Sequence, residues 1–193
     1  MASKIEPAAR DAEIAWIRRI AQGEREAFEE LYRAYQNRIF RYLCRMVRNP
    51  ETAAELLNDV MLEVWKRAGT FRAESRASTW IFGIAHHKAL NALRGKSPVT
   101  VDAENAIEVE DPAEGPEQLV ERESLERVIQ HALERLSPEH REILELTFYE
   151  ELSYPEIAAI VGCPINTVKT RVFYAKRQLQ PLLERFAIGR KGP

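Results

Sequence analysis

Apolar residues recur every three or four positions over most of the chain, the spacing that places side chains on one face of an α-helix. Ten prolines and eight glycines are few for a chain of 193 residues and leave these patterns largely uninterrupted. The predicted fold class is therefore all-α. The predicted helices cover residues 11–21, 24–47, 51–68, 79–93, 118–136, 141–148 and 153–161, and a last one starts at residue 165.

The segment 152–183 has the pattern of two helices joined by a sharp corner. Ser153, with Glu156 three residues later, predicts a capping box at the start of the first helix. Gly162 supplies the backbone freedom that the corner requires. The second helix has one apolar face, which predicts its buried side: Ile165, Val168, Val172, Ala175, Leu179, Leu182 and Phe186.

The opposite face of this second helix carries short polar groups, cations and two aromatic rings, and residues 163–193 have a net charge of +6. A recognition helix in a DNA major groove needs side chains for base edges, cations for phosphates and an apolar back. The alternative is a solvated basic face on an ordinary helix pair. The residues of this face are Asn166, Lys169, Thr170, Phe173, Tyr174 and Arg177.

The predicted helix over 51–68 has a broad apolar stripe and one apolar residue, Leu62, on its otherwise polar face. A lone exposed leucine is common on protein surfaces. A leucine framed by polar residues can equally anchor a binding partner. The residues that frame it are Glu55, Asn58 and Asp59.

A second basic surface lies between residues 72 and 96, which carry a net charge of +4. The predicted helix over 79–93 has an apolar side, to which Trp80 and Leu93 belong. Its remaining positions supply polar groups that can reach bases: His86, His87, Lys88, Asn91 and Arg94.

The net charge of −2 argues against nucleic-acid binding until its distribution is considered. Residues 97–126 carry −9, which leaves +7 on the rest of the chain. Charge of one sign and low apolar content predict a linker that does not fold alone. We hypothesise that the last domain folds back on the first, with the acidic linker masking basic surfaces. The predicted organisation is a tail at 1–10, a helical domain at 11–96, a flexible acidic linker at 97–116, a helix-turn-helix domain at 117–187 and a tail at 188–193.

No carboxylate pair, nucleophile constellation or glycine-rich phosphate loop predicts an enzyme or a cofactor site. Cys44 and Cys163 have no second cysteine at metal spacing, and the adjacent His86 and His87 point about 100° apart on a helix. We therefore predict no metal site. No apolar run is long enough for a signal peptide or a membrane-spanning helix, which predicts a cytoplasmic protein without membrane insertion.

Four motifs together resemble one protein family. Residues 53–65, AAELLNDVMLEVW, are similar to an AEDLVQETFLRVW-like segment, and residues 71–72 and 78–81 to FRG…TWL. Residues 136–142, LSPEHRE, are similar to LPxxxRE, and residues 152–172 to LSYxEIAxxLGxPxGTVKSRL. Over roughly residues 24–185 the chain resembles bacterial extracytoplasmic-function sigma factors of the sigma-70 family. The resemblance implies an alternative sigma factor, which is not an enzyme and directs core RNA polymerase to promoters.

The resemblance also implies roles for the first domain. The outer face of the helix over 51–68 would dock on the clamp helices of the largest polymerase subunit, through Glu55, Asn58, Asp59 and Leu62. The loop after Phe71 and the helix that follows would open the minus-ten element and hold a flipped base of the non-template strand. The implied minus-ten residues are Arg72, Ser75, His87, Lys88 and Asn91.

The terminal domain would read the minus-thirty-five element as a duplex, with Arg171 and Lys176 on phosphates. The resemblance implies two further partners, the flap of the second-largest polymerase subunit and an anti-sigma factor. The implied minus-thirty-five residues are Asn166, Lys169, Thr170, Arg171, Phe173, Tyr174, Lys176 and Arg177.

Two alternatives remain open at this point. A stand-alone helix-turn-helix regulator would bind DNA without polymerase, and a sigma mimic would titrate an anti-sigma factor without touching DNA. The chain has His87 and Asn91 where the family often has Asn and Asp, so the promoter sequence does not carry over from the family.

Overall fold

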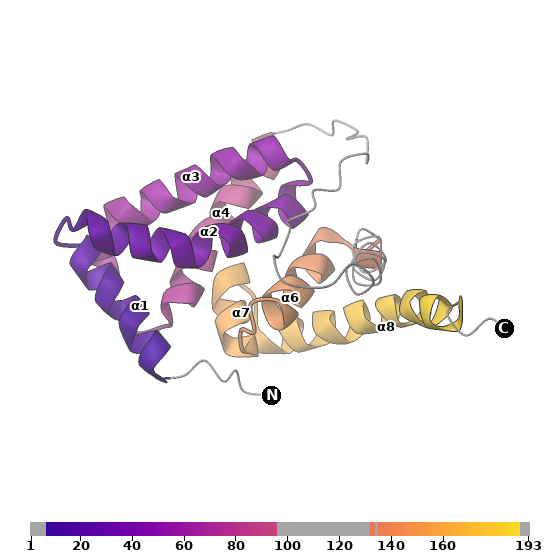
Figure 1. Cartoon of the computed structure of the whole chain (residues 1–193). Helices are drawn as coiled ribbons and strands as arrows, with labels where there is room; N and C mark the ends of the chain where they lie inside the picture. Colours follow the sequence, from indigo (N-terminus) through magenta and orange to yellow (C-terminus); the bar gives the residue numbers. More distant parts are fainter. Residues whose placement is uncertain (1–6, 96–131, 134, 190–193) are drawn as a thin grey trace, which may run out of the picture.

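The computed structural model of the chain describes residues 7–95, 132–133 and 135–189, and this part is helical without a strand (Figure 1). The predicted all-α class is confirmed. The predicted linker at 97–116 and most of the predicted helix over 118–136 lie outside the described residues. The elements are α1 (Pro7–Ile20), α2 (Arg25–Val47), α3 (Pro50–Arg67), a 3-10 turn η1 (Ala68–Thr70), α4 (Ala77–Gly95), α6 (Pro138–Phe148), α7 (Tyr154–Val161) and α8 (Ile165–Gly189).

Helices α1 to α4 form the N-terminal lobe. Asn49 starts α3 by accepting a hydrogen bond from the backbone N–H of Thr52 at 2.7 Å, and Pro50 occupies the first turn, where a missing N–H costs nothing. Helix α1 includes residues 7–10, which were predicted to belong to a tail. The apolar faces meet in a core that includes Leu31, Tyr35, Ile39, Val60, Met61, Val64, Ile81 and Phe82.

Helices α6 to α8 form the C-terminal lobe. Ser137 caps α6 by accepting from the backbone N–H of His140 at 3.3 Å. The capping box predicted for Ser153 and Glu156 is present at the start of α7. Helix α8 continues through Gly189, two residues past the predicted end of the domain.

The predicted apolar face of α8 is buried at Val168, Val172 and Ala175. Ile165, by contrast, is 42% exposed, so its predicted place in the core is wrong. Ile165 is the first residue of α8, and its neighbours in the corner, Gly162 and Pro164, are themselves exposed. The corner therefore leaves the first turn of the helix uncovered.

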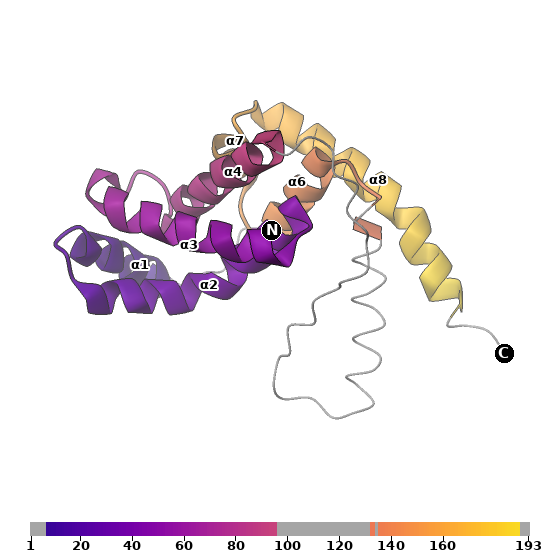
Figure 2. The ribbon, with the colours of Figure 1, turned by 90° about the horizontal axis from the view of Figure 1, so that it is seen from above.

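The two lobes pack directly against each other. Helix α7 lies along α4, and α6 lies against α2 (Figures 1 and 2). One cluster of buried apolar residues includes Tyr42 and Phe82 of the N-terminal lobe and Ile143 and Ile157 of the C-terminal lobe. The two helical domains predicted from the sequence therefore share a core.

Gly162 ends α7 with a positive φ of 66°, a backbone conformation that glycine adopts more readily than other residues. An added Cβ would meet no atom within 4 Å, so a side chain there would strain only the backbone. We expect Gly162→Ala to lower the free energy of unfolding by about 1 kcal/mol in urea denaturation. The control is Gly83→Ala, inside α4 and also without a neighbour within 4 Å, which should instead stabilise the chain. Destabilisation of equal size by both variants would contradict this account.

Candidate nucleic-acid and polymerase interface

The predicted recognition face of α8 is open to solvent. Phe173 and Tyr174 are 61% and 48% exposed, and their rings meet edge to face with centroids 5.5 Å apart. Asn166, Lys169 and Thr170 are exposed, and the Thr170 hydroxyl donates to the Asn166 carbonyl at 2.9 Å. Among the other predicted contact residues Lys176 and Arg177 are exposed and Arg171 is half-buried. Cations and exposed rings thus lie on a helix whose back is held in the core.

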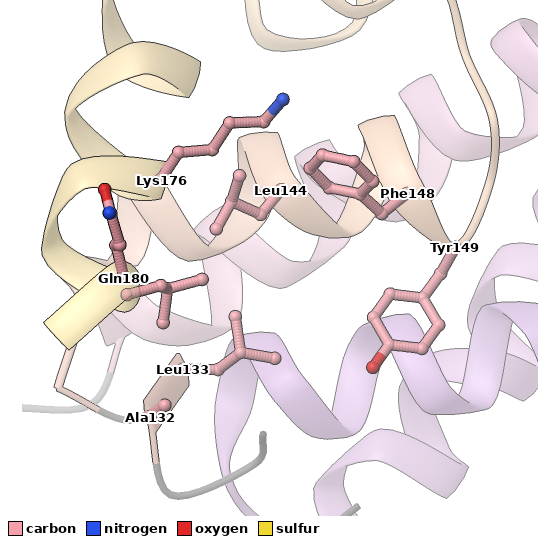
Figure 3. A pocket seen from close by; sticks show the side chains of 8 residues that line it. Ala132, Leu133, Leu144, Phe148, Tyr149, Lys176 and Gln180 are labelled. Carbon is pink, nitrogen blue, oxygen red and sulfur yellow. The ribbon is translucent and has the colours of Figure 1, made fainter. Parts of the chain in front are cut away.

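Lys176 also makes a contact within its own lobe, because its Nζ lies 4.9 Å from the centre of the Phe148 ring in α6. The two side chains stand at the rim of an apolar recess of about 550 Å³ between α6 and α8 (Figure 3). A cation over an aromatic face is attracted to the ring, so Lys176 is partly engaged within the lobe. The recess is lined by Ala132, Leu133, Leu144, Phe148, Tyr149, Lys176, Leu179 and Gln180.

The predicted minus-ten residues lie in two places. His87 and Asn91 are exposed one turn apart on α4, whereas Arg72 and Ser75 lie in the loop before the helix. Lys88 is half-buried, with its Nζ 3.9 Å from the Asp59 carboxylate of α3. Arg72 is exposed, and its guanidinium is 4.0 Å from Glu74. The structure therefore leaves Arg72, His87 and Asn91 exposed and holds Ser75 and Lys88 partly buried.

The predicted polymerase face of α3 is exposed as expected. Leu62 is 49% exposed, and Glu55, Asn58 and Asp59 around it are all exposed. These positions follow the three-to-four-residue spacing of one helix face. Leu93, by contrast, was expected in the core and is 38% exposed, because it lies in the last turn of α4, beyond its well-buried middle.

The interface between the lobes contains a buried polar cluster that the sequence analysis missed. Glu142 is 6% exposed, and one of its oxygens lies 2.5 Å from the Tyr42 hydroxyl and 2.6 Å from Nδ1 of His86. Burial and the charge of Glu142 raise the pKa of Tyr42 well above its ordinary value, so the hydroxyl keeps its proton and donates it. His86 was expected among the polar groups of α4 that can reach bases, and this is wrong, because α6 covers it.

Three further ion pairs cross the same interface. Arg38 Nη2 lies 2.7 Å from Glu150, Arg76 Nε lies 3.2 Å from Glu156, and Arg45 contacts Glu145. In each pair the cation belongs to the N-terminal lobe and the carboxylate to the C-terminal lobe. We call Arg38, Arg45 and Arg76 the arginine row, and Glu145, Glu150 and Glu156 the carboxylate row.

A sequence signal for this interface exists at Glu142 and Glu145. They lie three residues apart, on one face of α6, and Glu142 is the last residue of the LSPEHRE segment. Arg141 in the same segment donates to the carbonyls of Leu133 and Leu136 and to that of Arg45 in the other lobe. The motif therefore serves the contact between the lobes in addition to the fold of its own lobe.

Glu145 makes the packing of the lobes depend on pH. Burial raises the pKa of Glu145 to about 7, and Arg45 opposes this rise. In separated lobes the carboxyl would return to water, where its pKa is about 4.3. The packed state binds the proton more tightly, so packing is fully favoured below the lower pKa and weakens as the pH rises through about 7.

We therefore expect the radius of gyration from small-angle scattering to increase between about pH 4.5 and pH 7.5. The charged groups that act on Glu145 are Arg45, Arg41 and Glu150. Glu145→Gln removes the titrating group and should flatten the dependence. A pH dependence of the same size in this variant would assign the effect to another group.

Within the described ranges, no group of three or more histidine, cysteine or acidic side chains could hold a metal ion. Among the helices that the structure describes, none combines the length and the apolar character that a membrane crossing needs.

Comparison with known proteins identifies the two lobes. Residues 31–98 match the family profile Sigma-70 region 2, and residues 126–179 match Sigma-70, region 4. The RNA polymerase sigma-H factor of Pseudomonas aeruginosa is 33% identical over 180 residues, which cover 86% of this chain and 93% of that protein. The ECF RNA polymerase sigma-E factor of Escherichia coli K12 is 30% identical over 183 residues, which cover 88% of this chain and 95% of that protein.

Solved structures have the same fold. CnrH in complex with the cytosolic domain of CnrY matches with a TM-score of 0.67 at 20% identity, over 90% of this chain and 98% of CnrH. RpoE of Bartonella quintana in complex with the anti-sigma factor NepR matches with a TM-score of 0.64 at 24% identity, over 81% of this chain and 96% of RpoE.

Regions 2 and 4 on two helical lobes define a transcription initiation factor of bacterial RNA polymerase. The chain belongs to the extracytoplasmic-function group of the sigma-70 family. It is an alternative sigma factor, which binds RNA polymerase and promoter DNA.

Proposed function

We propose that the two lobes divide promoter recognition between them. The C-terminal lobe reads the minus-thirty-five element as a duplex with the exposed face of α8. The observation that carries this proposal is the set of exposed cations and rings on a helix with a buried back. The residues proposed for this contact are Asn166, Lys169, Thr170, Arg171, Phe173, Tyr174, Lys176 and Arg177.

The N-terminal lobe reads the minus-ten element after the strands separate. Single-stranded DNA needs cations for its backbone and polar groups for its unstacked bases. The loop before α4 and the exposed side of that helix supply both. The residues proposed are Arg72, Ser75, His87, Lys88 and Asn91.

The outer face of α3 docks on the clamp helices of the largest polymerase subunit, with Leu62 as the apolar anchor and Glu55, Asn58 and Asp59 around it. The flap of the second-largest subunit contacts the C-terminal lobe. Catalysis belongs to the polymerase, and the factor acts in the cytoplasm without a catalytic step or cofactor of its own.

An anti-sigma factor controls the chain by holding both lobes. This proposal is supported by RpoE of Bartonella quintana, which was solved in complex with the anti-sigma factor NepR.

The test is run-off transcription with purified core polymerase on a library of genomic fragments, with and without the chain. New transcripts that share two upstream motifs are the expected result, and they also supply the promoter sequence. Lys169→Ala should reduce these transcripts without reducing polymerase binding, because its side chain is exposed and remote from α3. No transcripts and no polymerase binding would instead favour a stand-alone DNA-binding regulator or a mimic that titrates an anti-sigma factor.

A further inference from the structure

The arginine row of the N-terminal lobe is covered by carboxyl groups of the C-terminal lobe in the packed chain. Each of its members faces a carboxylate of the C-terminal lobe across the interface. The arginine side chains keep 20–26% of their exposure, whereas those of Glu145 and Glu150 keep 3% and 4%. The carboxylates therefore reach into a basic surface that belongs to the other lobe.

Glu156 shows how firmly one of these anions is held. Its Oε2 accepts from the backbone N–H of Ser153 at 2.8 Å and from the Ser153 hydroxyl at 2.6 Å, which fixes it at the start of α7. Its Oε1 accepts from Arg76 at 3.2 Å and from the Thr79 hydroxyl at 3.3 Å. The entrance of the helix-turn-helix thus places a fixed negative charge on the N-terminal lobe.

These pairs do not fill the hydrogen-bonding capacity of the groups. In the part of the chain that the structure describes, Nη1 of Arg76 and Oε2 of Glu145 are buried without a hydrogen-bond partner. A guanidinium has five donors in a fixed fork, and a phosphate offers acceptors that match this fork in pairs. The same fork also matches a carboxylate, but here Arg76 keeps a buried donor without an acceptor, which a phosphate oxygen would satisfy.

The position of the arginine row in the N-terminal lobe indicates which phosphates it would bind. Arg76 directly follows Ser75, and Thr79 lies in the first turn of α4, so both adjoin the loop proposed to hold the minus-ten strand. Arg38 and Arg45 extend the basic surface along α2. The Arg38 guanidinium lies 5.7 Å from the centre of the Phe82 ring of α4, so this cation lies against the same helix that Thr79 begins.

We propose that the arginine row, with Thr79, binds backbone phosphates of the single-stranded promoter, and that the carboxylate row occupies this site while the lobes are packed. The packed chain thereby inhibits its own DNA binding. This proposal rests on the proposed function, in which the N-terminal lobe holds a single strand. The masking groups in this proposal are the carboxylates of the C-terminal lobe, whereas the linker of the sequence hypothesis lies outside the described residues.

The test measures the binding of a fluorescein-labelled single-stranded DNA of mixed sequence to the full chain by fluorescence anisotropy. Glu150→Gln with Glu156→Gln removes two carboxylates of the row, and glutamine can still accept the capping hydrogen bond from Ser153. We expect this double variant to bind the strand about tenfold more tightly at low salt. The matched control, Glu26→Gln with Glu30→Gln, removes two exposed charges of α2 and should change the affinity less than about twofold.

A second experiment tests whether the DNA strand binds to the arginine row. Adding Arg38→Gln and Arg76→Gln to the double variant should abolish the gain in affinity and reduce the slope of log affinity against log salt by about 1.4, the value for two single-strand phosphates. An unchanged slope would overturn the proposal. Displacement of the strand by polyglutamate as readily as by an unlabelled strand of equal charge would also overturn it, by assigning the row to acidic protein.

Run-off transcription with the wild-type chain separates this proposal from the proposed function. Transcripts that depend on the chain, together with equal strand affinity in the double variant and the wild type, would overturn the masking alone. A gain in strand affinity without any such transcripts would overturn the promoter function and leave the arginine row as a nucleic-acid site.

Discussion

Replacing Leu62 by aspartate is expected to weaken the binding of core RNA polymerase by about 100-fold, which corresponds to roughly 2.8 kcal/mol. Leu62 is 49% exposed, so the fold gains little from its side chain and should tolerate the change. In a docked complex the same side chain would be desolvated, and a carboxylate in its place would be buried without a partner. The substitution should therefore weaken polymerase binding and leave the free energy of unfolding nearly unchanged.

The measurement is the dissociation constant of the polymerase complex without DNA, with helix content followed by circular dichroism. Leu93→Asp is the matched control, because Leu93 is a leucine of similar exposure, 38%, on α4 and outside the proposed docking face. Only the change at Leu62 should weaken binding. Unchanged affinity for Leu62→Asp, or an equal loss for both variants, would remove α3 from the docking surface.

The helices of the described residues and the capping box of α7 were predictable from the sequence because they depend on local chemistry. In α2, the buried Leu31, Tyr35, Ile39 and Tyr42 repeat with the helical spacing, and this repeat is visible without any knowledge of the partner helix. Ser153 and Glu156 form their capping box within four residues of chain. Exposure of the polar face around Leu62 follows from the same periodicity.

The interface between the lobes was not predictable in this way. The spacing of apolar residues predicts which side chains are buried. It does not predict that a charged side chain will be buried against a partner that lies far along the chain. Glu142 is 56 residues from His86 and 100 from Tyr42, and read alone it is an ordinary polar position of α6. The burial of Glu142 depends on how the two lobes pack against each other.

The sequence was sufficient to predict which side chains of the candidate site are exposed. Phe173 and Tyr174 were expected on the open face of α8 and are found there, because the opposite face carries the apolar stripe. The engagement of Lys176 with the Phe148 ring depends on how α6 and α8 cross, which the spacing within one helix does not determine.

Replacing Glu142 by alanine is expected to separate the lobes. The change would leave the Tyr42 hydroxyl and His86 buried without the acceptor that both contact, and breaking a buried polar pair costs about 3 kcal/mol. Separation restores water to these groups while each lobe keeps its helices. The cost should therefore appear as opening of the interface and only secondarily as unfolding.

Small-angle scattering of the free chain at about pH 5, where protonation of Glu145 favours packing, gives the clearest measurement. The wild type should be compact, and Glu142→Ala should have a larger radius of gyration with unchanged helix content. Glu139→Ala is the control, because Glu139 lies exposed in the first turn of α6 and its loss costs about 0.5 kcal/mol through the helix dipole. Tyr42→Phe removes one of the two contacts and should open the chain less than Glu142→Ala does. An equally compact Glu142→Ala variant would mean that the shared apolar core alone holds the lobes together, and the polar cluster would then have no part in their packing.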